Sequence, residues 1–255
     1  MIIRKIHLMV GSYRVSTQAS EATQTLQRAE IDDMTLEGAF IATIQKGLYN
    51  AALDFKGYSF DQMDKSLIEA MRDDTSPDRV VLKVVYTDAG TFATTGKAKL
   101  TAFDWMWKHG DLARFQATAQ PSTEWLIGKV LHDGVGTAGW TVPAQSAPIE
   151  AGAIGAGQEA WIAWGAADPD GLAGTNPAFD VEVESDTSNA FAAPVQRVVV
   201  PQITTDARSG MVYIDGDVTP ISDTWWRINL ATVAGADDPT LRLLAIIVVR
   251  NKKES

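Results

Sequence analysis

No cysteine occurs among the 255 residues of the sequence. A disulfide framework, a thiolate metal site and a thiol nucleophile are therefore excluded, and the chain suits a reducing compartment. Basic residues are also scarce, since 22 Lys and Arg stand against 32 Asp and Glu, for a formal net charge of −10. A protein that docks on nucleic acid or anionic lipid normally gathers basic residues on one face, so we expect neither partner.

Long hydrophobic runs are missing as well. The longest late apolar stretch, LLAIIVV at 243–249, falls far short of the ~20 residues needed to span a bilayer. Near the N-terminus, Lys5, His7 and Arg14 interrupt any apolar run. We therefore expect neither a membrane segment nor a secretory leader.

Catalytic motifs are scarce. His7, His109 and His132 are scattered without an HExxH spacing, so we interpret them as structural or solvated, and no GxSxG motif occurs. The segment GAIGAG at 152–157 has the look of a phosphate-binding loop. No strand-to-helix unit follows it, which favours a flexible linker.

Paired acids offer only weak candidate sites. Adjacent carboxylates in a strand diverge, so the pairs Asp32/Asp33 and Asp73/Asp74 are poor candidates for glycoside hydrolysis. Asp168 and Asp170 in DPDG, and Asp215 and Asp217 in DGD, could supply oxygen ligands to calcium. Neither motif continues as a twelve-residue calcium loop, so we expect plain turns. The sequence thus predicts no catalytic, cofactor-binding or metal-binding residue.

The composition changes near residue 124. Residues 1–124 hold 14 Lys and Arg against 16 Asp and Glu, whereas residues 125–255 hold 8 against 16, so the net charges are −2 and −8. The segment 134–158 is dense in Gly, Ala and Pro, which interrupt helices and interior strands. We predict two domains, 1–124 and 125–255, with a linker between Gln120 and Gln158 and the boundary close to Pro121.

The first half predicts strands around one short helix. Ser59 and Gln62 form a capping pattern, and apolar residues then recur at helical spacing, which predicts an amphipathic helix over 60–72. Strand compositions occur at 7–17, 47–59, 79–89, 96–107 and 112–119. This order predicts a small β-sandwich or barrel with one flanking α-helix, and loops at 16–30 and 88–96.

The second half predicts strands and turns. Strand candidates occur at 160–165, 179–185, 197–204, 211–216, 224–233 and 241–250. Regular short strands of this kind predict an antiparallel β-sandwich resembling a jelly roll. In FDVEVES, alternation places Phe179, Val181 and Val183 inward, and it places Asp180, Glu182 and Glu184 on an acidic solvent face.

Two predicted strands carry large apolar residues on both faces, although a single core covers only one face. In DTWWRINL, Trp226 falls on the core face and Trp225 on the opposite one. In LRLLAIIVV, one face is apolar throughout, and the other still carries Leu244, Ile246 and Val248. A loop of the same domain, another domain or another subunit could cover that second face. Trp225, Leu244, Ile246 and Val248 are therefore candidate interface residues, and we expect Trp225 to lie half covered against Leu244, Ile246 or a neighbouring segment.

The first half also has a recognisable order of elements: paired strands ending at FKGYS, the short helix at 60–72, then the strands RVVLKVVYTDA and KAKLTAFDWMW. This order resembles the tail tube (major tail) proteins of long-tailed bacteriophages. The resemblance covers about half of the chain and includes no catalytic signature. Residues 125–255, with SDTSNAFAAP, ISDTWWRINL and GADDPTLRLLAIIVV, look like β-sandwich modules appended to phage structural proteins.

The resemblance implies a virion protein that is not an enzyme, is made in the host cytoplasm and needs no cofactor. Its copies would form stacked rings around the conduit for DNA ejection, in contact with other tail proteins. Rings would be hexameric if residues 1–124 are the only tube-type domain, and threefold if the second half is a cryptic second one. The C-terminal module would project outward.

The acidic charge suits a lumen through which DNA passes without specific binding, although solubility alone also explains it. The alternative is a carbohydrate-binding or adhesion module in which Trp225, Trp161 or Trp164 stacks on sugar rings. A glycoside hydrolase with a β-sandwich accessory domain ranks third.

Overall fold

The computed structural model describes residues 7–11, 13–14, 19–32, 44–58, 79–84, 89–106, 114–135, 139–166, 177–204, 209–235 and 239–252. All regular elements in these ranges are strands, which confirms the mainly β prediction. Because the described ranges include no helix, they include none that could cross a bilayer. The helix predicted over 60–72 lies outside the described residues and stays a prediction.

Sixteen strands make up the described fold. The first half contributes β1 (His7–Val10), β2 (Tyr13–Arg14), β3 (Ala19–Asp32), β4 (Ile44–Tyr58), β5 (Arg79–Val84), β6 (Phe92–Met106) and β7 (Arg114–Pro121). The second half contributes β8 (Leu126–Asp133), β9 (Ala144–Gln145), β10 (Ile149–Glu150), β11 (Gln158–Ala166), β12 (Ala178–Asp186), β13 (Val195–Val199), β14 (Ser209–Asp215), β15 (Trp225–Ala234) and β16 (Leu243–Asn251). Most predicted strands are present with shifted ends. The strand predicted at 7–17 is instead two short strands, β1 and β2, that pair antiparallel with each other. Strands β3 and β8 to β10 were not predicted as strands.

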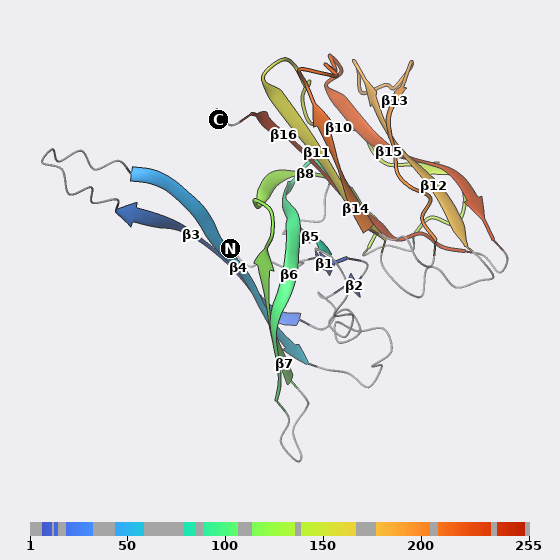
Figure 1. Ribbon diagram of the computed structural model, residues 1–255. Coiled ribbons are helices and arrows are strands. Elements are labelled where there is room, and N and C mark those ends of the chain that lie inside the picture. Colours follow the sequence, from blue (N-terminus) through green and yellow to red (C-terminus); the bar gives the residue numbers. More distant parts are fainter. Residues whose placement is uncertain are drawn as a thin grey trace, which may run out of the picture.

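Eleven of the strands form one antiparallel sheet, which we call the large sheet. Its main path runs β14-β11-β16-β8-β6-β5-β1-β2, and β7, β4 and β3 branch from it at β6. The branch arises because the first part of β6 pairs with β5 and β8, whereas residues 98–106 pair with β7. Beyond β7, β3 and β4 continue as a long two-stranded arm that projects from the rest of the molecule (Figure 1).

Strands β7 and β8 lie end to end along the same side of β6. Ala98 pairs with Pro121 at the end of β7, and Thr95 pairs with Leu126 at the start of β8. Between them, the backbone N–H groups of residues 122 and 123 donate to the Lys97 carbonyl at 2.9 and 3.3 Å. The predicted domain boundary near Pro121 therefore falls within a continuous hydrogen-bonded row, and the division into two domains stays a prediction.

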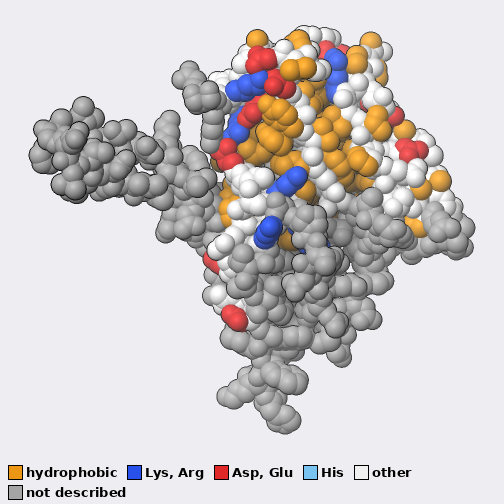
Figure 2. Space-filling model, viewed as in Figure 1, with side chains coloured by type: hydrophobic (Ala, Val, Ile, Leu, Met, Phe, Trp, Pro, Cys, Tyr) orange, Lys and Arg blue, Asp and Glu red, His pale blue; other side chains and the backbone are white. Residues whose placement is uncertain are grey.

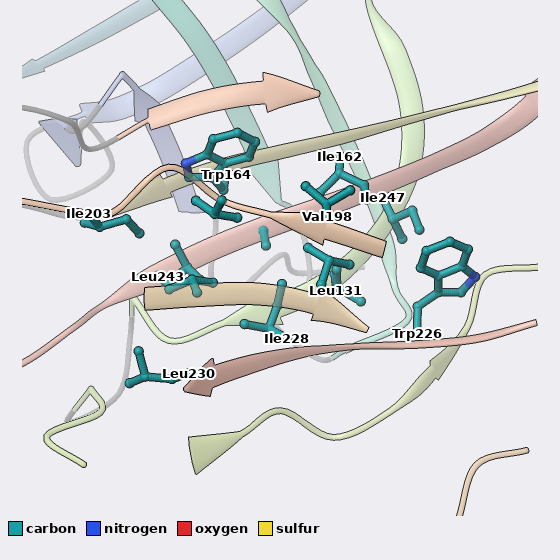
Figure 3. Close-up of a cluster of buried hydrophobic side chains, with 14 of the residues drawn as sticks. Leu131, Ile162, Trp164, Val198, Ile203, Trp226, Ile228, Leu230, Leu243 and Ile247 are labelled. Atoms are coloured by element: carbon teal, nitrogen blue, oxygen red, sulfur yellow. The ribbon is translucent and has the colours of Figure 1, made fainter. Parts of the chain in front are cut away.

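The remaining strands form the small sheet, in the order β10-β15-β12-β13, with β9 also paired to β15. Its inner face packs against β8, β11, β14 and β16 through one hydrophobic cluster, which we call the first cluster. Phe179, Val181 and Val183 of β12 are completely buried there, as predicted, and so is Trp226 of β15. Trp226 lies at one end of this cluster, and Trp164 belongs to the same cluster (Figure 3). Each large apolar side chain buried in this way contributes about 1.5–3 kcal/mol relative to an exposed one.

A second cluster lies on the opposite face of the large sheet, where β1 and β5 of the first half fold over β11 and β16. Strand β16 supplies both clusters, because Leu243, Ala245 and Ile247 enter the first and the alternate residues enter the second. All six residues from 243 to 248 are at most 1% exposed, which confirms that both faces of this strand are buried. A β-carbon at Gly165 would lie 2.9 Å from the Gly11 carbonyl oxygen, so glycine permits this close approach.

Two segments that we predicted as loops, 16–30 and 88–96, contain strand residues. Most of the loop expected at 16–30 is strand β3, and of the loop expected at 88–96 only a short turn at 89–91 precedes β6. Strand β3 lacks a clear apolar alternation, and its pairing with β4 determines its conformation.

The described residues of the Gly-rich segment 134–158 have regular backbone pairing. They include β9, β10 and a bridge between Ile154 and Ile221, whose two backbone hydrogen bonds are each 2.8 Å. Ile154 is completely buried, and Gly152 and Gly157 adopt positive φ values of 101° and 72° on either side of it. Glycine allows these backbone conformations at little steric cost, and it thereby directs Ile154 into the core.

Candidate interaction surface

The three β16 residues predicted as interface residues are covered within the chain. Leu244, Ile246 and Val248 belong to the second cluster, together with Met9 of β1 and Leu82 of β5. They are 0%, 0% and 1% exposed. The contact that covers them thus joins strands of the two halves of one chain, and it leaves none of the three side chains available to a second copy.

Trp225 lies on the outer face of the small sheet, because the alternate residues of β15 point into the first cluster. It is half-buried, as predicted, and pairs in register with Glu150 and Asp186. Leu244 and Ile246 lie on the far face of the large sheet, so the predicted contact with them is wrong. An intersubunit role for Trp225 stays a prediction.

The outer face of the small sheet forms its own polar network. Glu184 is only 8% exposed, and Arg227 Nε donates to its carboxylate at 2.8 Å. The same guanidinium lies over the Phe191 ring at 4.3 Å from its centroid. Asn229 Nδ2 donates to Glu182 and Glu184 at 3.3 and 3.0 Å. The prediction that Glu184 faces solvent is therefore wrong, because Arg227 on the neighbouring strand pairs with it and covers it.

An apolar surface remains at the end of the large sheet, on β11 and β14, and we call it the aromatic edge (Trp161, Met211 and Tyr213). Trp161 and Tyr213 are opposite in register, with ring centroids 4.6 Å apart and planes at 49°. Tyr213 is 43% exposed, while Trp161 and Met211 pack half-buried against the second cluster. The buried Trp161 Nε1 has no hydrogen-bond partner. Figure 2 shows hydrophobic side chains over β11, β14 and β16, bordered by charged groups towards the C-terminus.

Ion pairs border the aromatic edge. The pairs are Arg250–Glu124 at 2.9 Å, Arg250–Glu159 at 2.6 Å, and Lys252 with both Asp215 and Asp217. Lys252 holds the pKa of Asp215 and of Asp217 below the ordinary value of 3.8. Burial raises the pKa of Tyr213, and the nearby acids Asp215 and Glu159 raise it further. Four acids against two bases leave this border with a net charge of −2.

The candidate calcium ligands Asp215 and Asp217 both pair with Lys252. Asp217 also accepts a hydrogen bond from the Gly157 N–H at 2.7 Å, and this contact fixes the turn after β14. In the described part of the chain, no group of three or more His, Asp or Glu side chains could hold a metal ion. Asp168 and Asp170 lie outside the described residues.

Two of the three histidines have structural contacts. The buried His7 Nδ1 contacts the Asp133 carboxylate at 2.7 Å, which ties β1 to the end of β8. His132 stacks on Trp140 with ring centroids 4.1 Å apart, and burial lowers its pKa to about 4 although Asp133 opposes the shift. His109, Asp33 and the pair Asp73/Asp74 lie outside the described residues.

The aromatic residues named for sugar stacking have separate environments. Trp164 is 5% exposed and lies in the first cluster, so it offers no platform to a ligand. Its indole covers Gly210 of β14, where a β-carbon would lie 2.3 Å from Trp164 Cζ2. Trp161 and Trp225 are partly exposed, and they lie on different sheets. The structure therefore does not bring the three tryptophans into one binding site.

No family model and no curated protein matches the chain. Among solved structures, a chain of the virion of a native gene transfer agent particle is 12% identical with a TM-score of 0.40, over 50% of this chain and 98% of that chain. The SPP1 tail tube, from solid-state NMR and cryo-EM, is 10% identical with a TM-score of 0.38, over 50% and 78%.

The SPP1 Dit protein, described as a paradigm of the hub adsorption apparatus in phages that infect Gram-positive bacteria, is 9% identical with a TM-score of 0.33. That likeness covers 97% of this chain and 100% of the Dit chain. The neighbours are thus virion and phage-tail proteins, including the tail tube class that residues 1–124 resemble.

Proposed function

We propose that the chain is a structural subunit of a phage tail, which assembles with copies of itself into stacked rings that form the tail tube. DNA would pass through the lumen without specific binding, and other tail proteins would contact the ends of the tube. The protein would act in the virion after synthesis in the host cytoplasm, and its role requires no catalysis and no cofactor.

The observation that carries this proposal is the projecting arm of β3 and β4 (Figure 1). At its base, Leu53–Tyr58 of β4 also pair with β7, which makes three strands. Further out, among the described strands, β3 and β4 pair only with each other. An isolated two-stranded ribbon is marginally stable in water, so a partner outside the chain would stabilise this arm. Copies of the same chain are the partners that a ring supplies.

The open ends of the large sheet also support self-assembly. Among the described strands, β14 ends the sheet on one side, and β3 ends the branch that leaves β6. Unpaired strand edges invite pairing with another chain, and closure into a ring satisfies them in every copy. Six copies are expected if residues 1–124 are the only tube-type domain, and three if the second half is another.

Size-exclusion chromatography followed by negative-stain microscopy tests the proposal. We expect hollow rings or tubes, whose end views give the number of copies. A matched variant shortens the arm by joining Thr25 to Ala52 through a two-residue turn. It removes residues 26–51 and keeps every β4 residue that pairs with β7. This variant should keep its circular dichroism and melting temperature but form no rings. A wild-type chain that stays monomeric at high concentration would contradict the proposal.

The same preparation separates the alternative function. A monomer that binds a glycan array would support the carbohydrate-binding module, with Trp225 or Trp161 as the stacking residue. A monomer that hydrolyses glycosides would support the third hypothesis, a glycoside hydrolase with a β-sandwich accessory domain. Rings without glycan binding support the structural role.

A further inference from the structure

Among the described strands, β14 is an edge of the large sheet. It pairs with β11 over seven consecutive positions without a register shift, and no other described strand pairs with it. Only Ile214 of its seven residues is buried. Its sequence, SGMVYID, contains no proline, lysine or arginine. Natural sheets normally block such edges with these residues or with bulges, so β14 is free of the usual obstacles to strand addition.

The edge strand β13 of the small sheet provides the contrast. Pro194 precedes it, Pro201 follows shortly after it, and its pairing with β12 shifts register between Val183 and Glu184. Arg197 lies within the strand and donates to Ser185 Oγ and Asp223 Oδ2, each at 2.7 Å. The edge strand β13 is thus blocked by prolines, a register shift and an arginine, whereas β14 has none of these features.

The chain also contains a candidate strand to add there. Strand β3 pairs only with β4 among the described strands, and its register is regular over the eight residues from Glu21 to Arg28. The segment Ala22–Gln27 between these two charges contains neither a charged residue nor a proline. This six-residue segment is one residue shorter than β14, which spans seven.

Charges at the two ends select the direction of pairing. A β-carbon at Gly11 would lie 3.6 Å from Arg79 Nη1 and 3.8 Å from Ser209 Oγ, so a basic group lies at the start of β14. The acids Asp215 and Asp217 lie at its end. In a parallel pair, Glu21 of β3 meets the basic end and Arg28 meets the acidic end. An antiparallel pair would oppose like charges at both ends, which is unfavourable.

We propose that β3 of one copy adds to β14 of a neighbouring copy as a parallel strand, with Glu21 beside Ser209 and Gln27 beside Asp215. This register places Arg28 beside Gly216, between Asp215 and Asp217 in the sequence. The contact joins two different surfaces, so it is heterologous and compatible with a closed ring. The inference rests on the proposed ring assembly and names the strands that meet within it. It also explains why β14 presents the aromatic edge with Tyr213 partly exposed, since an added strand would cover it.

Because the chain contains no cysteine, single cysteines can test the pairing without background. Gln24→Cys and Thr25→Cys place thiols on the two faces of β3, and Val212→Cys and Tyr213→Cys do so on β14. Each β3 variant is mixed with each β14 variant, assembled and oxidised, and covalent dimers are measured on a non-reducing gel. We expect severalfold more dimer for Gln24→Cys with Val212→Cys, or for Thr25→Cys with Tyr213→Cys, than with Val199→Cys, which is exposed on the blocked strand β13.

Microscopy of the same samples separates this inference from the proposed function. Rings whose β3 thiols cross-link no better to β14 than to Val199→Cys would overturn the strand pairing and leave ring assembly standing. Absence of rings in every sample, wild type included, would overturn both. Arg28→Glu should lower the cross-linking yield severalfold without changing circular dichroism, and an unchanged yield would contradict the parallel direction.

Discussion

The adjacent residues Trp225 and Trp226 permit a sharp test of how β15 is placed. Trp226 is completely buried in the first cluster, and its Nε1 donates to the Gly152 carbonyl at 2.9 Å. Trp225 is half-buried on the opposite face of the same strand. The same substitution at two neighbouring positions should therefore have very different consequences.

Replacing Trp226 by alanine leaves a cavity and a carbonyl without its donor. Large aromatic-to-alanine changes in cores cost about 3–5 kcal/mol, which corresponds to a fall of roughly 6–20 °C in melting temperature for a chain of this size. Trp225→Ala removes only half-buried surface, and we expect about 1 kcal/mol, or roughly 2–4 °C. Trp226→Phe keeps most of the apolar contact but loses the hydrogen bond, so its cost of about 1–3 kcal/mol should lie between them.

Thermal and urea unfolding, followed by circular dichroism and tryptophan fluorescence, measure these differences. Trp226→Phe keeps the test informative if Trp226→Ala fails to fold. Equal losses for the two alanine variants would refute the assignment of Trp226 to the core and Trp225 to the outer face. A larger loss for Trp225→Ala would mean that the strand is inverted.

Two further predictions concern β14. Lys252 holds the pKa of Asp215 and Asp217 below 3.8, so these ion pairs stabilise the folded chain above that pH, and the gain disappears as the pH falls through the lowered pKa values. The difference in melting temperature between wild type and Lys252→Met should therefore be constant from about pH 5 to about pH 9 and shrink in acid, and a difference that persists in strong acid would contradict the ion pairs. Gly210→Ala would place a β-carbon 2.3 Å from Trp164 Cζ2 and should cost about 1–3 kcal/mol in urea unfolding. The control Gly155→Ala, whose nearest neighbour is 3.5 Å away, should stay within about 0.5 kcal/mol, and equal effects would count against the packing of Trp164 on β14.

Local alternation in the sequence was sufficient to predict several features of this protein. The period of two in FDVEVES and DTWWRINL identified Phe179, Val181 and Trp226 as core residues, because neighbouring side chains in a strand point to opposite faces. The continuous apolar run of β16 predicted a strand buried on both sides. Such patterns report whether a face is buried, and they do not report what covers it.

Only the tertiary structure decided which residues of the chain pack against one another. It placed Leu244, Ile246 and Val248 against β1 and β5 of the same chain, and it put Trp225 on a different sheet from them. It also turned the Gly-rich segment around Ile154 into part of the core, and paired Glu184 with Arg227. These contacts join residues far apart in sequence, so they depend on sheet order and register, which no local pattern encodes. The open edge at β14 follows from the same sheet order, since a strand is an edge only by its position among its neighbours.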